Sequence, residues 1–157
     1  MKNRNLLCWN SSKQSLEELP FVKTFDLKLL YGVNKQIEKI SKNTENFLKD
    51  LSYNHALLWG VRGSGKSTII RGILDNFSKK YENFITIEIN SEDLSDLPKI
   101  FLNFNFDKKV IFFIDDLSFE QNDRRYIQFK SFLEGSFYST KISFLIYVTT
   151  NRRHLMK

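Results

Sequence analysis

Residues 55–68 read HALLWGVRGSGKST, and this stretch decides the fold. It contains the apolar run Ala56–Trp59, which breaks at Gly60 into a loop that matches G-x-x-x-x-G-K-[ST] at every fixed position. A helical pattern follows Lys66. A glycine-rich turn can match so short a pattern by accident, but the strand before the loop and the helix after it are the context that marks a phosphate-binding P-loop.

The residue types in this loop suit an anion. Gly60, Gly63 and Gly65 let the backbone approach a phosphate without a Cβ in the way, so that amide N–H groups can point at its oxygens. Lys66 can reach the β- and γ-phosphates of a nucleotide, and the Ser67 hydroxyl can bind Mg²⁺. The helix that follows presents its positive end to the phosphates. The candidate nucleotide-binding residues are Gly60, Val61, Arg62, Gly63, Ser64, Gly65, Lys66, Ser67 and Thr68.

The composition is that of a globular chain about one domain long. The 157 residues are 41% hydrophobic and 15% aromatic, which argues against disorder. No apolar run reaches the roughly 18 residues of a membrane span, and the opening MKNRNLLCWN lacks the core of a signal peptide. We therefore expect no membrane partner and a cytoplasmic location. Cys8 is the single cysteine, which precludes an internal disulfide, and His55 and His154 are too separated to suggest a metal site.

The formal net charge of +6 is compatible with nucleic acid, an acidic protein or a nucleotide as the partner. The lysines are scattered along the expected helices and form no dense basic block, so a solvated surface is the simpler interpretation. Nucleic acid therefore stays an alternative partner without a residue pattern to support it.

Hydrophobic periodicity gives the order of elements from about residue 33 onward. We expect helices over residues 33–51, 66–77, 93–104 and 123–134, and strands over residues 56–59, 84–89, 110–114 and 142–148. Strands that alternate with helices predict an α/β fold, and the P-loop makes it a three-layer α/β/α fold with a mostly parallel sheet. Residues 1–30 contain only small apolar clusters, and no element is assigned there.

Two acidic residues follow one of these strands. The run Val110–Ile114 is continuously apolar, as in a parallel strand covered on both faces, and Asp115 and Asp116 come directly after it. An acid after such a run is the Walker B pattern, in which Asp115 would hold Mg²⁺ opposite Ser67. Thr68 is a less suitable ligand, because the motif places the metal-binding hydroxyl directly after the lysine. Asp116 could then orient or deprotonate the attacking water.

Asn151 follows the last expected strand, after Thr149 and Thr150. Ligands of open α/β folds bind at the carboxyl ends of the strands. A side-chain amide there could hold the attacking water or the γ-phosphate. The alternative for each of these polar residues, taken alone, is an ordinary turn or helix cap.

Together these elements resemble the Walker A, Walker B and sensor 1 elements of the AAA+ class of P-loop ATPases. The strings LLWGVRGSGKS, DDLSFE, FKSFLEG and LIYVTTNRRHL further resemble a bacterial family of predicted AAA+ ATPases of unassigned cellular role, over roughly residue 30 to the end. The resemblance implies ATP as the nucleotide and Mg²⁺ as the cofactor. The positions that match the family are Lys66, Asp116 and Asn151 as catalytic residues, and Ser67 and Asp115 as metal ligands.

The chain departs from the AAA+ pattern in two places. Most AAA+ proteins carry Glu where this chain has Asp116, so the candidate base is one methylene shorter and Glu120 is an alternative base. AAA+ modules also continue past sensor 1 through another helix, a fifth strand beside the P-loop strand and a helical lid, whereas this sequence stops at Lys157. We therefore expect a poorly defined arm over residues 1–30 and a C-terminally truncated AAA+-like core over residues 31–157.

Two pairs of arginines lie near these motifs in the sequence. Arg152 and Arg153 follow Asn151 and could serve the γ-phosphate of a neighbouring subunit, or could simply open the next helix on the surface. Arg124 and Arg125 are expected to face solvent on the polar side of their helix.

The expected function is Mg²⁺-dependent ATP hydrolysis that drives conformational change in a homo-oligomer or in a client. A GTPase is disfavoured because no N-K-x-D motif follows the Walker B strand. The alternative is a nucleotide-binding switch or assembly module that does not hydrolyse ATP by itself, including one that acts on nucleic acid.

Overall fold

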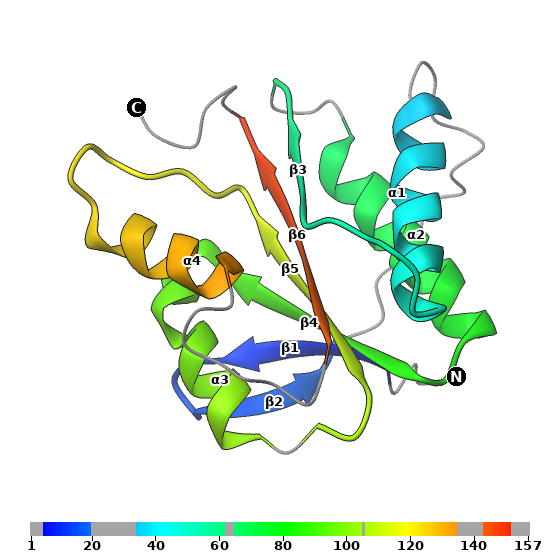
Figure 1. Ribbon diagram of the computed structural model, residues 1–157. Helices are drawn as coiled ribbons and strands as arrows, with labels where there is room; N and C mark the ends of the chain where they lie inside the picture. Colours follow the sequence, from blue (N-terminus) through cyan, green and yellow to red (C-terminus); the bar gives the residue numbers. More distant parts are fainter. Residues whose placement is uncertain (1–4, 20–33, 62–64, 105, 135–142, 152–157) are drawn as a thin grey trace.

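The computed structural model describes residues 5–19, 34–61, 65–104, 106–134 and 143–151. They form an α/β fold around one six-stranded sheet with the order β2-β1-β4-β5-β6-β3 (Figure 1). Every neighbouring pair of strands is parallel except β1 with β2, so the predicted mostly parallel sheet is confirmed. The strands are β1 (Leu6–Asn10), β2 (Ser15–Glu18), β3 (Ala56–Trp59), β4 (Phe84–Asn90), β5 (Lys109–Asp115) and β6 (Phe144–Thr150). The helices are α1 (Asn34–Leu48), α2 (Lys66–Lys80), the 3-10 helix η2 (Ser91–Asp96), α3 (Leu97–Asn103) and α4 (Arg124–Glu134).

Helices cover both faces of the sheet, as the predicted three-layer arrangement requires. Helices α1 and α2 pack on one face, and η2, α3 and α4 pack on the other (Figure 1). In β5, Ile111 and Phe113 belong to the core beneath α1 and α2, whereas Phe112 and Ile114 belong to the core beneath η2, α3 and α4. A parallel strand buried on both faces has no solvated side, which explains the unbroken apolar run in its sequence.

The N-terminal strands are the main difference from the sequence-based expectation. Strands β1 and β2 form an antiparallel hairpin, and β1 extends the sheet by pairing in parallel with β4. Trp9 is 5% exposed in the core, and its indole N–H donates to Asp96 Oδ2 at 2.9 Å. Part of residues 1–30, which the sequence analysis treats as an arm, therefore belongs to the same sheet as the core. The division at residue 30 itself stays a prediction.

The remaining elements agree with the periodicity, apart from one helix. The helix expected over residues 93–104 is divided into η2 and α3, with Pro98 in the first turn of α3, where its missing N–H costs nothing. Ile142, where the last strand is expected to begin, lies outside the described residues.

The topology brings three strand ends to one edge of the sheet. Strand β6 lies between β5 and β3, and all three are parallel, so their carboxyl ends are neighbours (Figure 1). Strand β3 leads into the P-loop, β5 ends at Asp115, and β6 ends at Thr150. This edge therefore collects the residues that the sequence marks for function.

Candidate functional site

The P-loop connects β3 to α2, and backbone hydrogen bonds hold both of its ends. The Gly60 N–H donates to the carbonyl oxygen of Thr150 at 3.2 Å, which ties the start of the loop to β6. Gly65 precedes α2 with φ 88° and ψ 10°, a left-handed conformation that disfavours a Cβ. Its carbonyl oxygen accepts from the Ile69 N–H at 2.9 Å, so the helix begins at Lys66. The predicted loop residues Arg62, Gly63 and Ser64 lie outside the described residues.

Lys66 lies at the centre of the polar contacts along this edge. Its ammonium donates to the carbonyl oxygens of Gly60 at 2.6 Å and Val61 at 3.0 Å. It also donates to Asn151 Oδ1 at 3.2 Å. The lysine therefore joins the P-loop to the end of β6, two segments that are far apart in the sequence.

Ser67 contacts the carboxylate that was predicted to share a metal ion with it. The Ser67 hydroxyl donates to Asp115 Oδ1, and the Thr149 hydroxyl donates to the same oxygen. The Asp115 carboxylate thus accepts hydrogen bonds from α2 and from β6. Thr68 lies next to Ser67 in α2, but the hydroxyl that contacts Asp115 is that of Ser67.

Asp116 and Asn151 also meet, as members of the same hydrogen-bonded chain. The Asn151 amide donates to Asp116 Oδ1 at 2.9 Å. The Asp116 backbone N–H donates to Thr149 Oγ1 at 2.9 Å. Asp116 has φ 56°, a left-handed conformation that Asp tolerates better than most residues and that turns the chain sharply after β5. The side chain is exposed and can therefore meet a ligand or a water from solvent.

Three residues of this site were not found from the sequence. Thr149 bonds to Asp115 and to the backbone of Asp116, as described above. Arg71 pairs with Glu88 of β4 at 2.5 Å, and its Nη2 lies 3.7 Å from Asp115 Oδ2. Two signals were available: Arg71 stands one helical turn after Ser67, and Glu88 is the charged residue of the otherwise uncharged strand β4.

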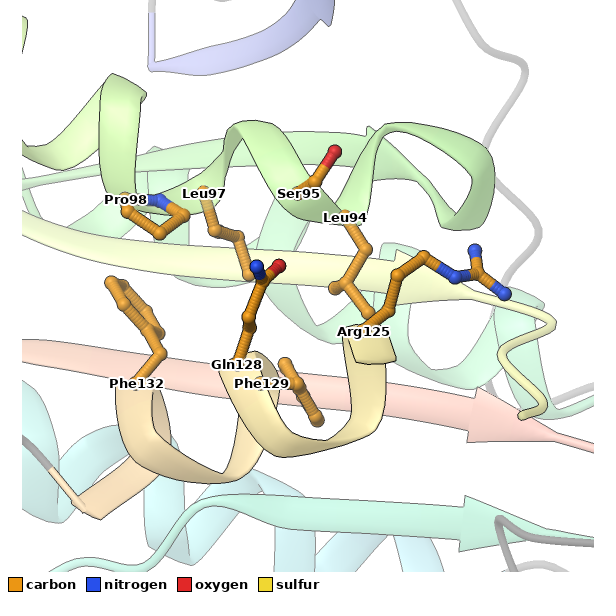
Figure 2. Close-up of a pocket in the computed structure, with 8 residues that line it drawn as sticks. All are labelled: Leu94, Ser95, Leu97, Pro98, Arg125, Gln128, Phe129 and Phe132. Atoms are coloured by element: carbon orange, nitrogen blue, oxygen red, sulfur yellow. The ribbon is translucent and has the colours of Figure 1, made fainter. Parts of the chain in front are cut away.

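A small pocket lies elsewhere, between the η2–α3 segment and α4 (Figure 2). Its lining residues are Leu94, Ser95, Leu97, Pro98, Arg125, Gln128, Phe129 and Phe132. Arg124 is exposed, as expected, whereas Arg125 is half-buried: its guanidinium packs over Phe119 and donates to Asp123 and to the Ser91 carbonyl oxygen at 3.1 Å. The side-chain hydrogen bond between Arg125 and Asp123 raises the pKa of Arg125 and lowers the pKa of Asp123. Arg125 therefore ties α4 to η2.

The fold and the order of its motifs define a P-loop protein with an AAA+ core. The chain belongs to the family described as "Protein of unknown function (DUF815)", whose family model matches residues 2–157. No curated protein matches the chain.

Solved structures with this fold include Thermotoga maritima RuvB, described as a Holliday junction branch migration motor. The sequence identity is 16% and the TM-score is 0.54, over 79% of this chain and 40% of the RuvB chain. Two RuvB variants from the same organism match at 16% identity with TM-scores of 0.54 and 0.52, over 79% of this chain and 41% of theirs. This chain therefore spans about two-fifths of the length of those proteins, and the likeness establishes the fold.

Two features are absent from the described ranges. None of the helices described there has both the length and the apolar character that crossing a bilayer requires. In the same ranges, no three or more His, Cys, Asp or Glu side chains gather as a metal-binding group.

Proposed function

We propose that this protein binds Mg²⁺-ATP across the P-loop and hydrolyses it. One observation carries the proposal: a continuous chain of hydrogen bonds links Ser67, Asp115, Thr149, Asp116, Asn151 and Lys66 at the carboxyl ends of β3, β5 and β6. These residues come from three separate segments of the sequence, and Lys66, Ser67, Asp115, Asp116 and Asn151 have side chains of the kinds that phosphoryl transfer from a nucleotide to water uses. The choice of adenine rests on the family resemblance alone.

Phosphate binding is assigned to the loop and to the first turn of α2, residues 60–68. The backbone N–H groups there and the positive end of a 15-residue helix favour an anion. Lys66 supplies the full positive charge. Its ammonium already spans the start of the loop through Gly60 and Val61, so it can exchange these carbonyl oxygens for phosphate oxygens with little movement of the stem.

The residues present fit a magnesium ion. A hydroxyl and a carboxylate are oxygen ligands of the kind Mg²⁺ prefers, and Ser67 and Asp115 bring one of each together. Mg²⁺ characteristically keeps several waters and takes other ligands from substrate phosphates, which agrees with a site to which the described residues contribute Ser67 and Asp115. When bound, the ion would neutralise the charge that develops on the phosphates during transfer.

The water-directing role is assigned to Asp116 and Asn151. The carboxylate of Asp116 is exposed and can accept a proton from a water beside the γ-phosphate. The amide of Asn151 bonds to Asp116 through Nδ2 and to Lys66 through Oδ1, so it can align the acid with the phosphate-binding lysine. Glu120 remains the alternative base.

Turnover in AAA+ proteins serves movement, and we propose the same use here, within a homo-oligomer or on a client. RuvB acts on Holliday junctions, and an equivalent action on nucleic acid is an alternative for this chain that its scattered lysines do not favour. Arg152 and Arg153 are proposed as arginines that act on a neighbouring subunit; they lie outside the described residues.

The proposal is tested by thermal unfolding with Mg²⁺-ATP, Mg²⁺-ADP and Mg²⁺-GTP, followed by phosphate release from the same samples. A ligand that binds only the folded state raises the unfolding temperature. Stabilisation by ATP together with phosphate release supports an ATPase. Stabilisation without release supports the second candidate, a nucleotide-binding switch, and no stabilisation by any nucleotide contradicts both.

A further inference from the structure

Arg71 lies between two carboxylates beside the proposed metal site. Its Nε pairs with Glu88 Oε1 at 2.5 Å, and its Nη2 lies 3.7 Å from Asp115 Oδ2. Its guanidinium carbon lies 5.4 Å from the centre of the Phe113 ring. Arg71 therefore makes its close ion pair with Glu88 and only a longer one with Asp115.

The secondary structure fixes this arrangement. Arg71 follows Ser67 by one turn of α2, so both side chains project from the same side of the helix. Glu88 of β4 is the register partner of Phe113 in β5, and Asp115 is two residues further along β5 on the same face of the sheet. The three charged groups therefore meet in the space between α2 and the two strands.

The two oxygens of Asp115 have different surroundings. Oδ1 accepts the hydroxyls of Ser67 and Thr149, whereas Oδ2 faces the guanidinium of Arg71. A positive charge so close to a metal-binding carboxylate opposes a cation there. The negative charge of Glu88 offsets it and holds the guanidinium away from Oδ2.

We propose that Arg71 and Glu88 are positioning residues that set how strongly Asp115 holds the divalent cation of the bound nucleotide. Glu88 keeps Arg71 engaged and leaves Oδ2 available to the cation. Without Glu88, Arg71 closes on Asp115 and competes with the cation. Without Arg71, Glu88 adds negative charge and strengthens cation binding. This inference rests on the proposed function, since it concerns the same metal site.

The test measures the Mg²⁺ concentration at the midpoint of ATP-induced thermal stabilisation, at a fixed and saturating ATP concentration. Glu88→Gln should raise this midpoint about tenfold, and Arg71→Met should lower it by a similar factor. These factors lie at the weak end of the Coulomb range because solvent screens the pair: the side chains of Arg71 and Asp115 are 39% and 37% exposed. The double variant should return to within about threefold of wild type, since the two opposing charges are then both absent. Glu88→Asp keeps the charge and should stay near the wild-type midpoint.

Stabilisation by ATP in EDTA provides the control and should be the same in all variants, because the pair acts on the cation. Midpoints that stay within about twofold of wild type, or that move in the same direction in Glu88→Gln and Arg71→Met, overturn the inference. If Arg71→Met does not fold, the comparison of Glu88→Gln with Glu88→Asp decides alone. A wild-type chain that ATP does not stabilise at any Mg²⁺ concentration overturns the proposed function, an outcome distinct from unchanged midpoints in a responsive protein.

Discussion

Thr149 bonds to both acidic residues of the site, so its replacement tests how the site is held together. The side chain is 1% exposed. Its hydroxyl donates to Asp115 Oδ1 and accepts from the Asp116 N–H at 2.9 Å. Thr149→Val keeps the branched shape and removes both hydrogen bonds. One involves a carboxylate, at about 1.5–3 kcal/mol, and the other is neutral, at about 0.5–1.5 kcal/mol. We therefore expect the free energy of unfolding to fall by about 2–4.5 kcal/mol.

Urea denaturation at neutral pH measures this loss, with the slope m compared between variants to confirm that the same transition is observed. Thr86→Val is a matched control, because Thr86 is a 2% exposed sheet residue whose hydroxyl has no hydrogen-bond partner within the described structure. Removing that hydroxyl should leave stability unchanged or raise it by about 1 kcal/mol. The reasoning is refuted if Thr149→Val stays within about 0.5 kcal/mol of wild type, or if both variants lose equally.

Three further predictions concern the phosphate contact, the acid and the half-buried His55. Lys66→Ala should weaken ATP binding about 10–100-fold in equilibrium titrations, the effect of losing a charged hydrogen bond. Asp116→Asn should leave ATP affinity nearly unchanged and slow phosphate release by about 100-fold or more, as loss of a general base does. Burial lowers the pKa of His55, and its Nδ1 accepts the Ile146 N–H at 3.0 Å. Because the pKa is lowered in the folded state, neutral His55 contributes stability above its unfolded pKa of about 6.5, and this contribution is lost as the pH falls through the folded-state pKa. His55→Asn, measured by urea midpoints between about pH 7 and 5, should abolish that part of the pH dependence.

Each of these predictions has a control or a contradicting outcome. Lys80→Ala, an exposed lysine in the last turn of the same helix, should leave ATP affinity unchanged. If Lys66→Ala behaves like Lys80→Ala, the P-loop assignment is wrong. Turnover that survives Asp116→Asn would transfer the role of base to Glu120. If wild type and His55→Asn lose the same stability as the pH falls, the loss arises from groups other than His55.

Much of the fold could be predicted because its signals are local. The run in β5 is apolar at every position, as required of a strand buried between two helical layers, and it ends at Asp115. The P-loop motif predicted the strand before Gly60 and the helix after Gly65. The N-terminal hairpin was missed because its strands have only five and four residues, and its burial depends on β4, which lies far along the chain.

Some of the contacts around Asp115 could likewise be predicted from local motifs, and others could not. The motifs predicted that Asp115 would lie opposite Ser67, and they gave Asp116 a role toward the attacking water and Asn151 a role toward that water or the γ-phosphate. The structure brings Ser67 to Asp115 and Asn151 to Asp116. The roles assigned to them stay predictions. The positions of Thr149, Arg71 and Glu88 depend on the register between strands and on the side of α2 that faces the sheet. Periodicity does not specify that register, so these contacts required the three-dimensional structure.

The most direct test of the central claim is calorimetric titration of the protein with ATP, ADP and AMP in the presence of Mg²⁺. Recognition through the P-loop, Lys66 and the metal ligands depends on the β- and γ-phosphates and hardly on the base. ATP and ADP should therefore bind much more tightly than AMP, and chelation of Mg²⁺ should weaken ATP. Equal affinity for all three nucleotides, or no binding of ATP, would contradict the assignment of this edge of the sheet as a nucleotide-binding site.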